Sequence, residues 1–258
     1  MIVTTAGRAN NEMIQVAMEY ANQLQISFVN RKKLSVEELM AKEQDDVLVV
    51  GKNRLDIYPL SDPHEVIFFH PNSAMFRVKR ILRGEEDPFI LAAKLEKGMT
   101  FLDCTLGLGS DSIVASHVVG DTGHVIGVEG NRYLAFLLEQ GLKTLDSGNE
   151  EMNIAMRQIE VIYSDHLDYL KRQENSSFDV VYLDPMFDAK IVESDGIRGL
   201  RTIALYSEII EETIEEAKRV ACKRVVLKDH WQSTRFGTFG FTVYRRKTAK
   251  FHFGVIEK

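Results

Sequence analysis

The residues best suited to chemistry in this chain form the segment Val181-Tyr182-Leu183-Asp184-Pro185-Met186-Phe187. An amino group conjugated to a ring or a carbonyl has a delocalised lone pair. A catalyst must therefore accept hydrogen bonds from both N–H groups, so that the lone pair turns toward an electrophile. The Asp184 carboxylate and the Pro185 carbonyl supply two acceptors, held by the fixed φ of proline, and Phe187 offers a ring on which a flipped-out base can stack. The motif predicts catalysis on an amino group; the alternative is a strand-ending turn with an incidental aromatic residue.

A glycine-containing loop lies upstream, in the segment Asp103-Cys104-Thr105-Leu106-Gly107-Leu108-Gly109-Ser110-Asp111. Two glycines two residues apart let the backbone turn tightly and approach a bulky ligand. The dinucleotide-binding fingerprint has a third glycine where this chain has Ser112, and it does not have the leading Asp103. The loop is more similar to the first motif of class I S-adenosylmethionine (SAM) methyltransferases, because carboxylates favour a cofactor that carries a sulfonium and an ammonium group. For the glycines alone, an ordinary turn is the alternative.

Carboxylates also end the next two predicted strands. Glu129 follows the apolar run 125–128 and can accept hydrogen bonds from both hydroxyls of a ribose. Asp165, two residues after Tyr163, can accept one from an adenine amino group. Taken separately, Glu129 is compatible with a surface or capping role, and Ser164 or Asp165 with a helix cap. Together with the glycine loop, they predict a nucleoside-binding edge of a sheet.

Apolar, β-rich runs alternate with helical patterns after residue 98. The predicted strands are Thr100–Cys104, Val125–Glu129, Glu160–Tyr163, Val180–Asp184 and Arg224–Lys228. Apolar residues on one face predict a helix over 209–220. The run 180–183 lacks polar alternation, as in strands that are covered on both faces. This order predicts a doubly wound, mostly parallel α/β sheet, whose ligands bind beyond the carboxyl ends of the strands.

The first seventy residues predict a smaller α/β unit. Asn10 or Asn11 begins a helical pattern, Ser35 and Glu38 form a capping box, and the runs 47–50, 55–58 and 66–69 predict strands, the first two joined as a hairpin. We therefore divide the chain into a small N-terminal α/β extension (1–72), a helical connector (73–97) and a main domain (98–258). Aromatic residues between 231 and 244 predict a packed C-terminal antiparallel hairpin, with RNA contact by the interleaved basic residues left open.

Composition excludes several classes of protein. The 258 residues are 45% hydrophobic and 27% charged, without low-complexity stretches, which indicates a folded chain. No apolar run is long enough for a membrane helix, and the N-terminus lacks a signal-peptide pattern. Cys104 and Cys222 suit neither a disulfide framework nor a thiolate cage, and the seven histidines show no metal-binding spacing. We therefore expect a cytoplasmic protein that needs no metal and no membrane.

Charge is unevenly distributed along the chain. The net charge is −6, yet residues 223–258 carry nine Lys and Arg against two acids. A second basic cluster contains Arg77, Lys79, Arg80 and Arg83. This asymmetry is compatible with an anionic partner that contacts one face, and a solvated surface without a partner is the alternative.

Three segments together resemble the small-subunit ribosomal RNA guanine-N2 methyltransferase J family. They are the loop 103–111, the motif 181–187 and the strand Ala221-Cys222-Lys223-Arg224-Val225-Val226-Leu227-Lys228. Met186 replaces the second proline of the Asp-Pro-Pro-aromatic motif of amino-group methyltransferases, and it is part of this family's motif. The resemblance covers roughly residues 98–230. The chain departs from the family at Asp188, where members have proline, and after Lys228, where members have a basic residue and proline.

The resemblance implies a Rossmann-like class I methyltransferase sheet, SAM as the cofactor, and a guanine amine in ribosomal RNA or the small ribosomal subunit as the substrate. The motif residues expected in catalysis are Asp184, Pro185 and Phe187. The resemblance implies cofactor contacts at Ser110, Asp111, Glu129, Gly130, Asp165, His166 and Asp184, and the loop motif adds Asp103, Thr105, Gly107 and Gly109. Three alternatives stay open: methylation of a protein glutamine amide or a small molecule, a non-catalytic SAM-binding assembly protein, and a nicotinamide-dependent oxidoreductase, which Ser112 disfavours.

Overall fold

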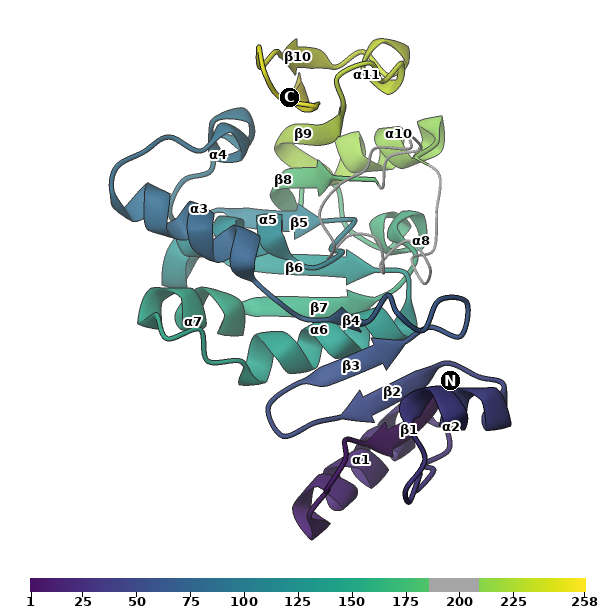
Figure 1. Ribbon diagram of the computed structural model, residues 1–258. Helices are drawn as coiled ribbons and strands as arrows, with labels where there is room; N and C mark the ends of the chain where they lie inside the picture. The colour runs from purple at the N-terminus through teal and green to yellow at the C-terminus, as the bar shows by residue number, and fades with distance from the viewer. Residues whose placement is uncertain (186–208) are drawn as a thin grey trace. The chain divides into compact units, whose positions relative to one another are not determined.

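The computed structural model describes residues 1–185 and 209–258, which divide into two compact units (Figure 1). Residues 1–70 form the smaller unit, and the described residues from Pro71 onward form the larger one. Each unit has its own sheet.

The smaller unit is a four-stranded sheet with two helices. Its elements are β1 (Ile2–Thr5), α1 (Asn11–Leu24), α2 (Val36–Glu43), β2 (Val47–Val50), β3 (Leu55–Tyr58) and β4 (Ile67–Phe68), with strand order β1-β2-β3-β4. The predicted caps are confirmed, because the Asn10 side chain accepts from the Met13 N–H and Ser35 forms a capping box with Glu38. β1 pairs in parallel with β2, an element that the sequence did not predict.

The larger unit is built on a seven-stranded sheet. Its elements before the undescribed segment are α3 (Asn72–Leu82), α4 (Pro88–Ala93), β5 (Thr100–Asp103), α5 (Ser110–Val119), η1 (Gly120–Thr122), β6 (His124–Glu129), α6 (Arg132–Thr144), α7 (Glu150–Arg157), β7 (Ile159–Tyr163), α8 (His166–Lys171) and β8 (Phe178–Leu183). After it come α10 (Glu211–Val220), β9 (Ala221–His230), α11 (Arg235–Thr238), β10 (Thr242–Tyr244) and β11 (Phe251–Glu257). The strand order is β10-β11-β9-β8-β5-β6-β7.

Strands β7, β6, β5, β8 and β9 are parallel to one another, whereas β11 pairs antiparallel with β9, and β10 antiparallel with β11, at one edge. This confirms the predicted Rossmann-like α/β sheet with a C-terminal antiparallel hairpin. The residues of β8 from Val180 to Leu183 are completely buried, as expected for a strand covered on both faces. Helix α10 buries Ile214, Ala217 and Val220 against the same core.

The aromatic residues of the C-terminal segment were predicted to pack, and this is correct for only some of them. Phe236 and Phe241 are buried in the core, and Phe239 packs against it. Trp231 and Tyr244 are 53% and 40% exposed, so the packing prediction is wrong for these two. Tyr244 follows Val243, which packs against the core, so the alternation of side chains along β10 turns Tyr244 to the opposite face.

The chain reverses its direction across the sheet at β5. From β5 it proceeds to β6 and β7 on one side, and then returns to pair β8 with the other side of β5. At such a switch point the connections leave the two strands in opposite directions, which opens a crevice at their carboxyl ends. Asp103 and Asp184 stand at these two strand ends.

Candidate active site

Asp184 directly follows β8, and its backbone and side chain are both held by neighbours. Its N–H donates to Thr105 Oγ1 at 2.6 Å, which ties the end of β8 to the glycine loop. Its Oδ2 accepts from Lys228 Nζ, also at 2.6 Å. Burial raises the pKa of Asp184 to about 6, although the Lys228 charge acts in the opposite direction. Pro185 is buried beside it, while Phe187 and Met186 lie outside the described residues.

Lys228 lies between two carboxylates. Its Nζ is 2.6 Å from Asp184 Oδ2 and 3.1 Å from Asp111 Oδ2, and it lies 5.0 Å from the centre of the Phe251 ring. Desolvation disfavours a buried ammonium, but the two acids outweigh it and hold the pKa of Lys228 above its usual range. The Lys228 side chain is therefore a permanent cation next to the motif aspartate.

Asp111, in the first turn of α5, is surrounded by donors. Its Oδ1 accepts from Arg77 Nη1, and its Oδ2 accepts from the Tyr182 hydroxyl at 2.8 Å in addition to Lys228. Although burial acts to raise it, the charges of Lys228 and Arg77 hold the pKa of Asp111 well below its usual range. The Asp111 carboxylate thus binds Arg77, Tyr182 and Lys228 at the same time.

Arg77 corrects one interpretation of the sequence. The sequence groups Arg77 with Lys79, Arg80 and Arg83 in a basic cluster that could meet an anionic partner. In the structure Arg77 forms a bidentate ion pair with Asp87, Nε to Oδ2 at 2.8 Å and Nη2 to Oδ1 at 2.9 Å, in addition to its contact with Asp111. An arginine engaged by two carboxylates has no charge left to attract an external anion. This member of the cluster is part of the interior.

The glycine loop is fixed by Asp103. The two carboxylate oxygens of Asp103 accept from the Thr105 N–H at 3.0 Å and from the Ser112 hydroxyl at 2.6 Å. Ser112, which distinguishes the loop from the dinucleotide fingerprint, is therefore a ligand of the leading aspartate. Gly107 and Gly109 have φ values of 53° and 73°, in the left-handed region.

The loop also packs closely on β6. A Cβ at Gly127 would lie 2.4 Å from a Leu106 methyl carbon, so this strand position needs a glycine for Leu106 to pack on it. The Leu106 N–H donates to the Val128 carbonyl at 3.0 Å. Together these contacts hold the loop against the carboxyl end of β6.

Glu129 ends β6 and contacts the glycine loop. Its Oε2 accepts from the Gly107 N–H at 3.2 Å, and its Oε1 accepts from the Asn131 N–H at 2.9 Å. Burial raises its pKa to about 7, and these backbone donors only partly offset that effect. Burial likewise raises the pKa of Asp103 to about 7.

Asp165 and His166 are held differently from the residues above. Asp165 Oδ1 caps α8 by accepting from the N–H groups of Leu167 and Asp168, as in the capping interpretation. His166 is buried and its Nε2 lies 3.5 Å from the Thr213 hydroxyl of α10. Both follow β7, the strand at the far side of β6 from β5, while Gly130 and Ser110 flank Glu129 and Asp111 in the chain.

The structure thus links Asp184, Thr105 and Asp103 by hydrogen bonds, and links Glu129 to Gly107. None of Lys228, Arg77 and Tyr182 was expected in the site from the sequence. For Lys228 the sequence held a signal, because the predicted strands 180–184 and 224–228 end in Asp184 and Lys228, and parallel strands bring their carboxyl ends to one edge of the sheet. The structure adds the register, in which Leu183 pairs with Leu227.

The residues at this edge fit SAM. Its sulfonium and ammonium groups favour nearby carboxylates, and its ribose hydroxyls are donors. Asp103 and Glu129 are buried acids whose raised pKa values show that the protein does not fully compensate their charge. A carboxylate that has accepted two backbone N–H groups keeps lone pairs for further donors, so Glu129 can still accept from hydroxyls.

Residues 1–185 and 209–258 contain no group of three or more His, Cys, Asp and Glu that could hold a metal ion. Among the helices that the structure describes, none is long and apolar enough to cross a membrane.

Comparison with known proteins identifies the class of enzyme. Residues 27–238 match a family model described as "Putative SAM-dependent methyltransferase". A Bacillus subtilis (strain 168) relative, the uncharacterized protein YpiP, is 48% identical over 256 residues and covers 99% of both chains. Ribosomal RNA small subunit methyltransferase J of Coxiella burnetii (strain RSA 331 / Henzerling II) is 29% identical over 181 residues, which are 67% of this chain and 68% of that protein.

A solved structure has the same fold. The SAM-dependent methyltransferase NGO1261 from Neisseria gonorrhoeae aligns with a TM-score of 0.65 at 18% identity, covering 100% of this chain and 96% of that one. The family model covers most of the chain, and the carboxylates of Asp103, Glu129 and Asp184 are acceptors of the kind that the hydroxyl and ammonium groups of SAM require. The chain therefore belongs to this family of SAM-dependent methyltransferases, and S-adenosylmethionine is its cofactor.

Proposed function

We propose that this enzyme methylates an exocyclic amino group of a nucleic-acid base, namely guanine in ribosomal RNA. The single observation that carries the proposal is the position of Asp184. It stands at the carboxyl end of β8, beside the sheet's switch point and bonded through its N–H to the glycine loop. An acceptor next to the cofactor loop is what an amine substrate needs.

In the proposed mechanism, SAM supplies the methyl group as an electrophile bonded to a cationic sulfur. Asp184 and the Pro185 carbonyl accept hydrogen bonds from the two N–H groups of the amine, so that the nitrogen lone pair turns toward the electrophile. Phe187 stacks on the base. The bond from nitrogen to the methyl carbon would form as the bond from that carbon to sulfur breaks, with the electron pair staying on sulfur. One N–H proton then passes to the Asp184 carboxylate, which restores a neutral amine.

Lys228 is a positioning residue in this proposal. By binding Asp184 Oδ2 it fixes the rotation of the carboxylate and favours its ionised form. A carboxylate has lone pairs on both oxygens, so Asp184 can accept from Lys228 and from an amine at the same time. Asp111, which Lys228 also contacts, holds the ammonium in place from the other side.

RNA as the substrate rests on the distant relatives. Relatives that are 28–29% identical are named ribosomal RNA small subunit methyltransferase J. The basic C-terminal segment offers fewer cations to an RNA than its composition suggests, because several of them are bound within the protein. Arg224 donates to the Ala92 carbonyl, Arg235 pairs with Asp229, and Lys228 lies in the site. The exposed Arg245 and Lys247 remain for contact with phosphates.

The proposal is tested by comparing the nucleosides of small-subunit ribosomal RNA from cells with and without the gene by mass spectrometry. We expect one methylated guanosine to disappear with the gene and to return when the purified enzyme and methyl-labelled SAM are added. Label in a protein glutamine or a small molecule, with none in RNA, would instead establish one of the alternative substrates.

Asp184→Asn is the matched test of the site. It preserves the shape of the side chain but removes the charge, and we expect kcat to fall about 10²- to 10³-fold, as for loss of one oriented polar group in other active sites. Asp121→Asn, an exposed carboxylate of the same unit, is the control and is expected to leave kcat unchanged. If ribosomal RNA were fully methylated in cells whose only copy of the enzyme carries Asp184→Asn, the alternative of a non-catalytic SAM-binding protein would be favoured.

A further inference from the structure

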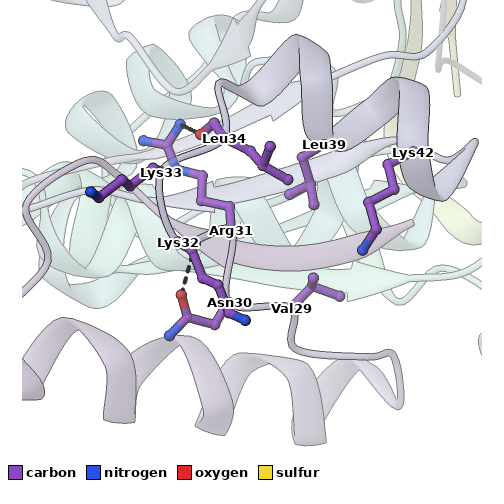
Figure 2. A pocket seen from close by; sticks show the side chains of 8 residues that line it. All are labelled: Val29, Asn30, Arg31, Lys32, Lys33, Leu34, Leu39 and Lys42. Atoms are coloured by element: carbon purple, nitrogen blue, oxygen red, sulfur yellow. Dashed lines mark hydrogen bonds between the residues drawn. The ribbon is translucent and has the colours of Figure 1, made fainter.

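The smaller unit contains a pocket that the proposed reaction does not use. Its volume is about 610 Å³, within the range of ligand sites in proteins. Figure 2 shows its lining side chains, which come from the loop between α1 and α2 and from α2 itself: Val29, Asn30, Arg31, Lys32, Lys33, Leu34, Leu39 and Lys42. We call it the N-terminal basic pocket.

The charge of this pocket is opposite to that of its surroundings. Residues 1–70 contain seven Lys and Arg and ten Asp and Glu, so the smaller unit is acidic. Four of the seven cations line the pocket, and none of the ten acids does. Gathering the cations of an acidic unit in one hollow creates a local positive potential that attracts anions.

The loop that carries these cations has a defined shape. Arg31 Nε donates to the Thr5 carbonyl at 3.0 Å, and Arg31 Nη1 donates to the Leu34 carbonyl at 3.2 Å. The Val29 N–H donates to the Val3 carbonyl at 2.8 Å, which ties the loop to β1. The pocket wall is therefore built into the sheet and needs no ligand to order it.

Two of the four cations are best placed to contact a ligand. Arg31 is committed to backbone carbonyls, and Lys42 pairs with Glu43 at 2.8 Å. Lys32 and Lys33 are exposed, and neither forms an ion pair with any described residue. Val29, Leu34 and Leu39 add apolar surface to the lining. Cations beside apolar surface suit a ligand that has both phosphates and flat rings.

We propose that the N-terminal basic pocket binds the RNA substrate, with Lys32 and Lys33 neutralising phosphates and Val29 and Leu34 contacting a base or a ribose. This inference rests on the proposed function, because an RNA substrate is long enough to reach a second binding point on the same chain. A second point of attachment raises the local concentration of RNA at the catalytic unit without any new contact there.

The test measures binding of the full-length protein to deproteinised small-subunit ribosomal RNA by filter binding at several salt concentrations. The variants are Lys32→Gln and Lys33→Gln, and the control is Lys52→Gln, an exposed lysine of the same unit outside the pocket. Loss of one phosphate contact decreases the magnitude of the slope of log K against log salt by about 0.7–0.9 and weakens binding about four- to fivefold at 0.15 M salt. We expect this for each pocket variant and less than a twofold change for the control.

The outcomes separate this inference from the proposed function. Pocket variants that bind RNA as Lys52→Gln does, with unchanged unfolding temperatures, would overturn the inference even if the enzyme methylates RNA. Weakened RNA binding by both pocket variants would support the inference, whereas a wild-type enzyme that transfers no methyl group to RNA would overturn the proposed function, and with it RNA as the substrate held in this pocket. Pocket variants that lose binding of poly-glutamate but not of RNA would assign the pocket to an acidic protein and overturn the inference.

Discussion

At the scale of single residues, the site depends on one cation, Lys228, that lies between two carboxylates whose pKa values are shifted in opposite directions. Lys228 lies 2.6 Å from Asp184 and 3.1 Å from Asp111. Asp111 has a second cation, Arg77, so its pKa is held well below the usual range, whereas burial raises the pKa of Asp184 to about 6. The acceptor proposed for the substrate amine is therefore the carboxylate that takes up a proton more readily.

The pH dependence of methyl transfer follows from this inequality. The ionised Asp184 carboxylate accepts a hydrogen bond from the amine more strongly than the protonated acid does, and its ionised fraction increases with pH through about 6. With SAM at saturation, so that the titration of Asp103 and Glu129 in the free enzyme does not limit the rate, we expect kcat to be constant above pH 7 and to fall about tenfold per pH unit well below pH 6. Initial rates between pH 5 and pH 9 measure this, and a rate independent of pH across that range would contradict it.

Replacement of Lys228 should move that inflection. Lys228→Met removes the charge that favours ionised Asp184, while Asp111 and Asp229 still disfavour it, so the pKa of Asp184 should rise. We expect activity to be lost at pH 7 and partly recovered at pH 9. Lys228→Arg keeps the charge and should leave the inflection near pH 6. If Lys228→Met folds and has the wild-type inflection, Lys228 does not act through Asp184.

At the scale of elements, the site exists because loops and strand ends are tied to one another. Leu106 packs on Gly127, Gly107 donates to Glu129, and Thr105 accepts from Asp184. The glycine loop therefore bonds to the last residue of β6 and to the residue that follows β8. Its own conformation depends on the positive φ values of Gly107 and Gly109.

Gly109→Ala tests this conformation, with Gly148→Ala as a matched control. Both glycines have φ near 70°, where a Cβ costs about 1–2 kcal/mol, so both variants should lose that much stability. Only at Gly109 does a Cβ meet neighbours, with Leu138 Cδ2 at 3.4 Å, while Gly148 is in open space. We expect about tenfold weaker SAM binding, or about 1.4 kcal/mol, for Gly109→Ala alone. Titration calorimetry with SAM measures this, and equal affinities in the two variants would contradict the role of the loop.

Much of the larger sheet could be predicted from the sequence, because its buried parallel strands are continuous apolar runs and each ends in a recognisable polar residue. The predicted strands exist, with bounds shifted by up to three residues; β9, for example, begins at Ala221. The ion pairs of Asp111 with Arg77 and Lys228 could not be predicted from apolar runs and strand ends. Arg77 and Lys228 are distant from it in sequence, and residue type alone does not distinguish an internal arginine from a surface one. The position of Arg77, three residues after the buried Ala74 of α3, was the available signal.

At the scale of the whole molecule, the two units have separate hydrophobic cores. The smaller unit buries Ile2, Leu39, Met40 and Val47 in one cluster. The larger unit buries the strands that end at the site, together with α10, in another. All the residues proposed for methyl transfer belong to the larger unit, and the N-terminal basic pocket belongs to the smaller one. A substitution that destabilises the smaller unit should therefore leave the affinity of the larger unit for SAM unchanged.

The same substitution placed in each core tests this separation. Met40 of α2 and Met156 of α7 are 1% and 0% exposed, and truncation of a buried methionine to alanine costs about 2–5 kcal/mol. SAM at 100 times its Kd stabilises the unit that binds it by about 2.7 kcal/mol. In scanning calorimetry we expect Met156→Ala to lower the transition that SAM raises, and Met40→Ala to lower another transition while SAM affinity stays at the wild-type value. If Met40→Ala weakens SAM binding, or if one transition responds to both variants and to SAM, the two cores are coupled and the smaller unit contributes to the catalytic fold itself.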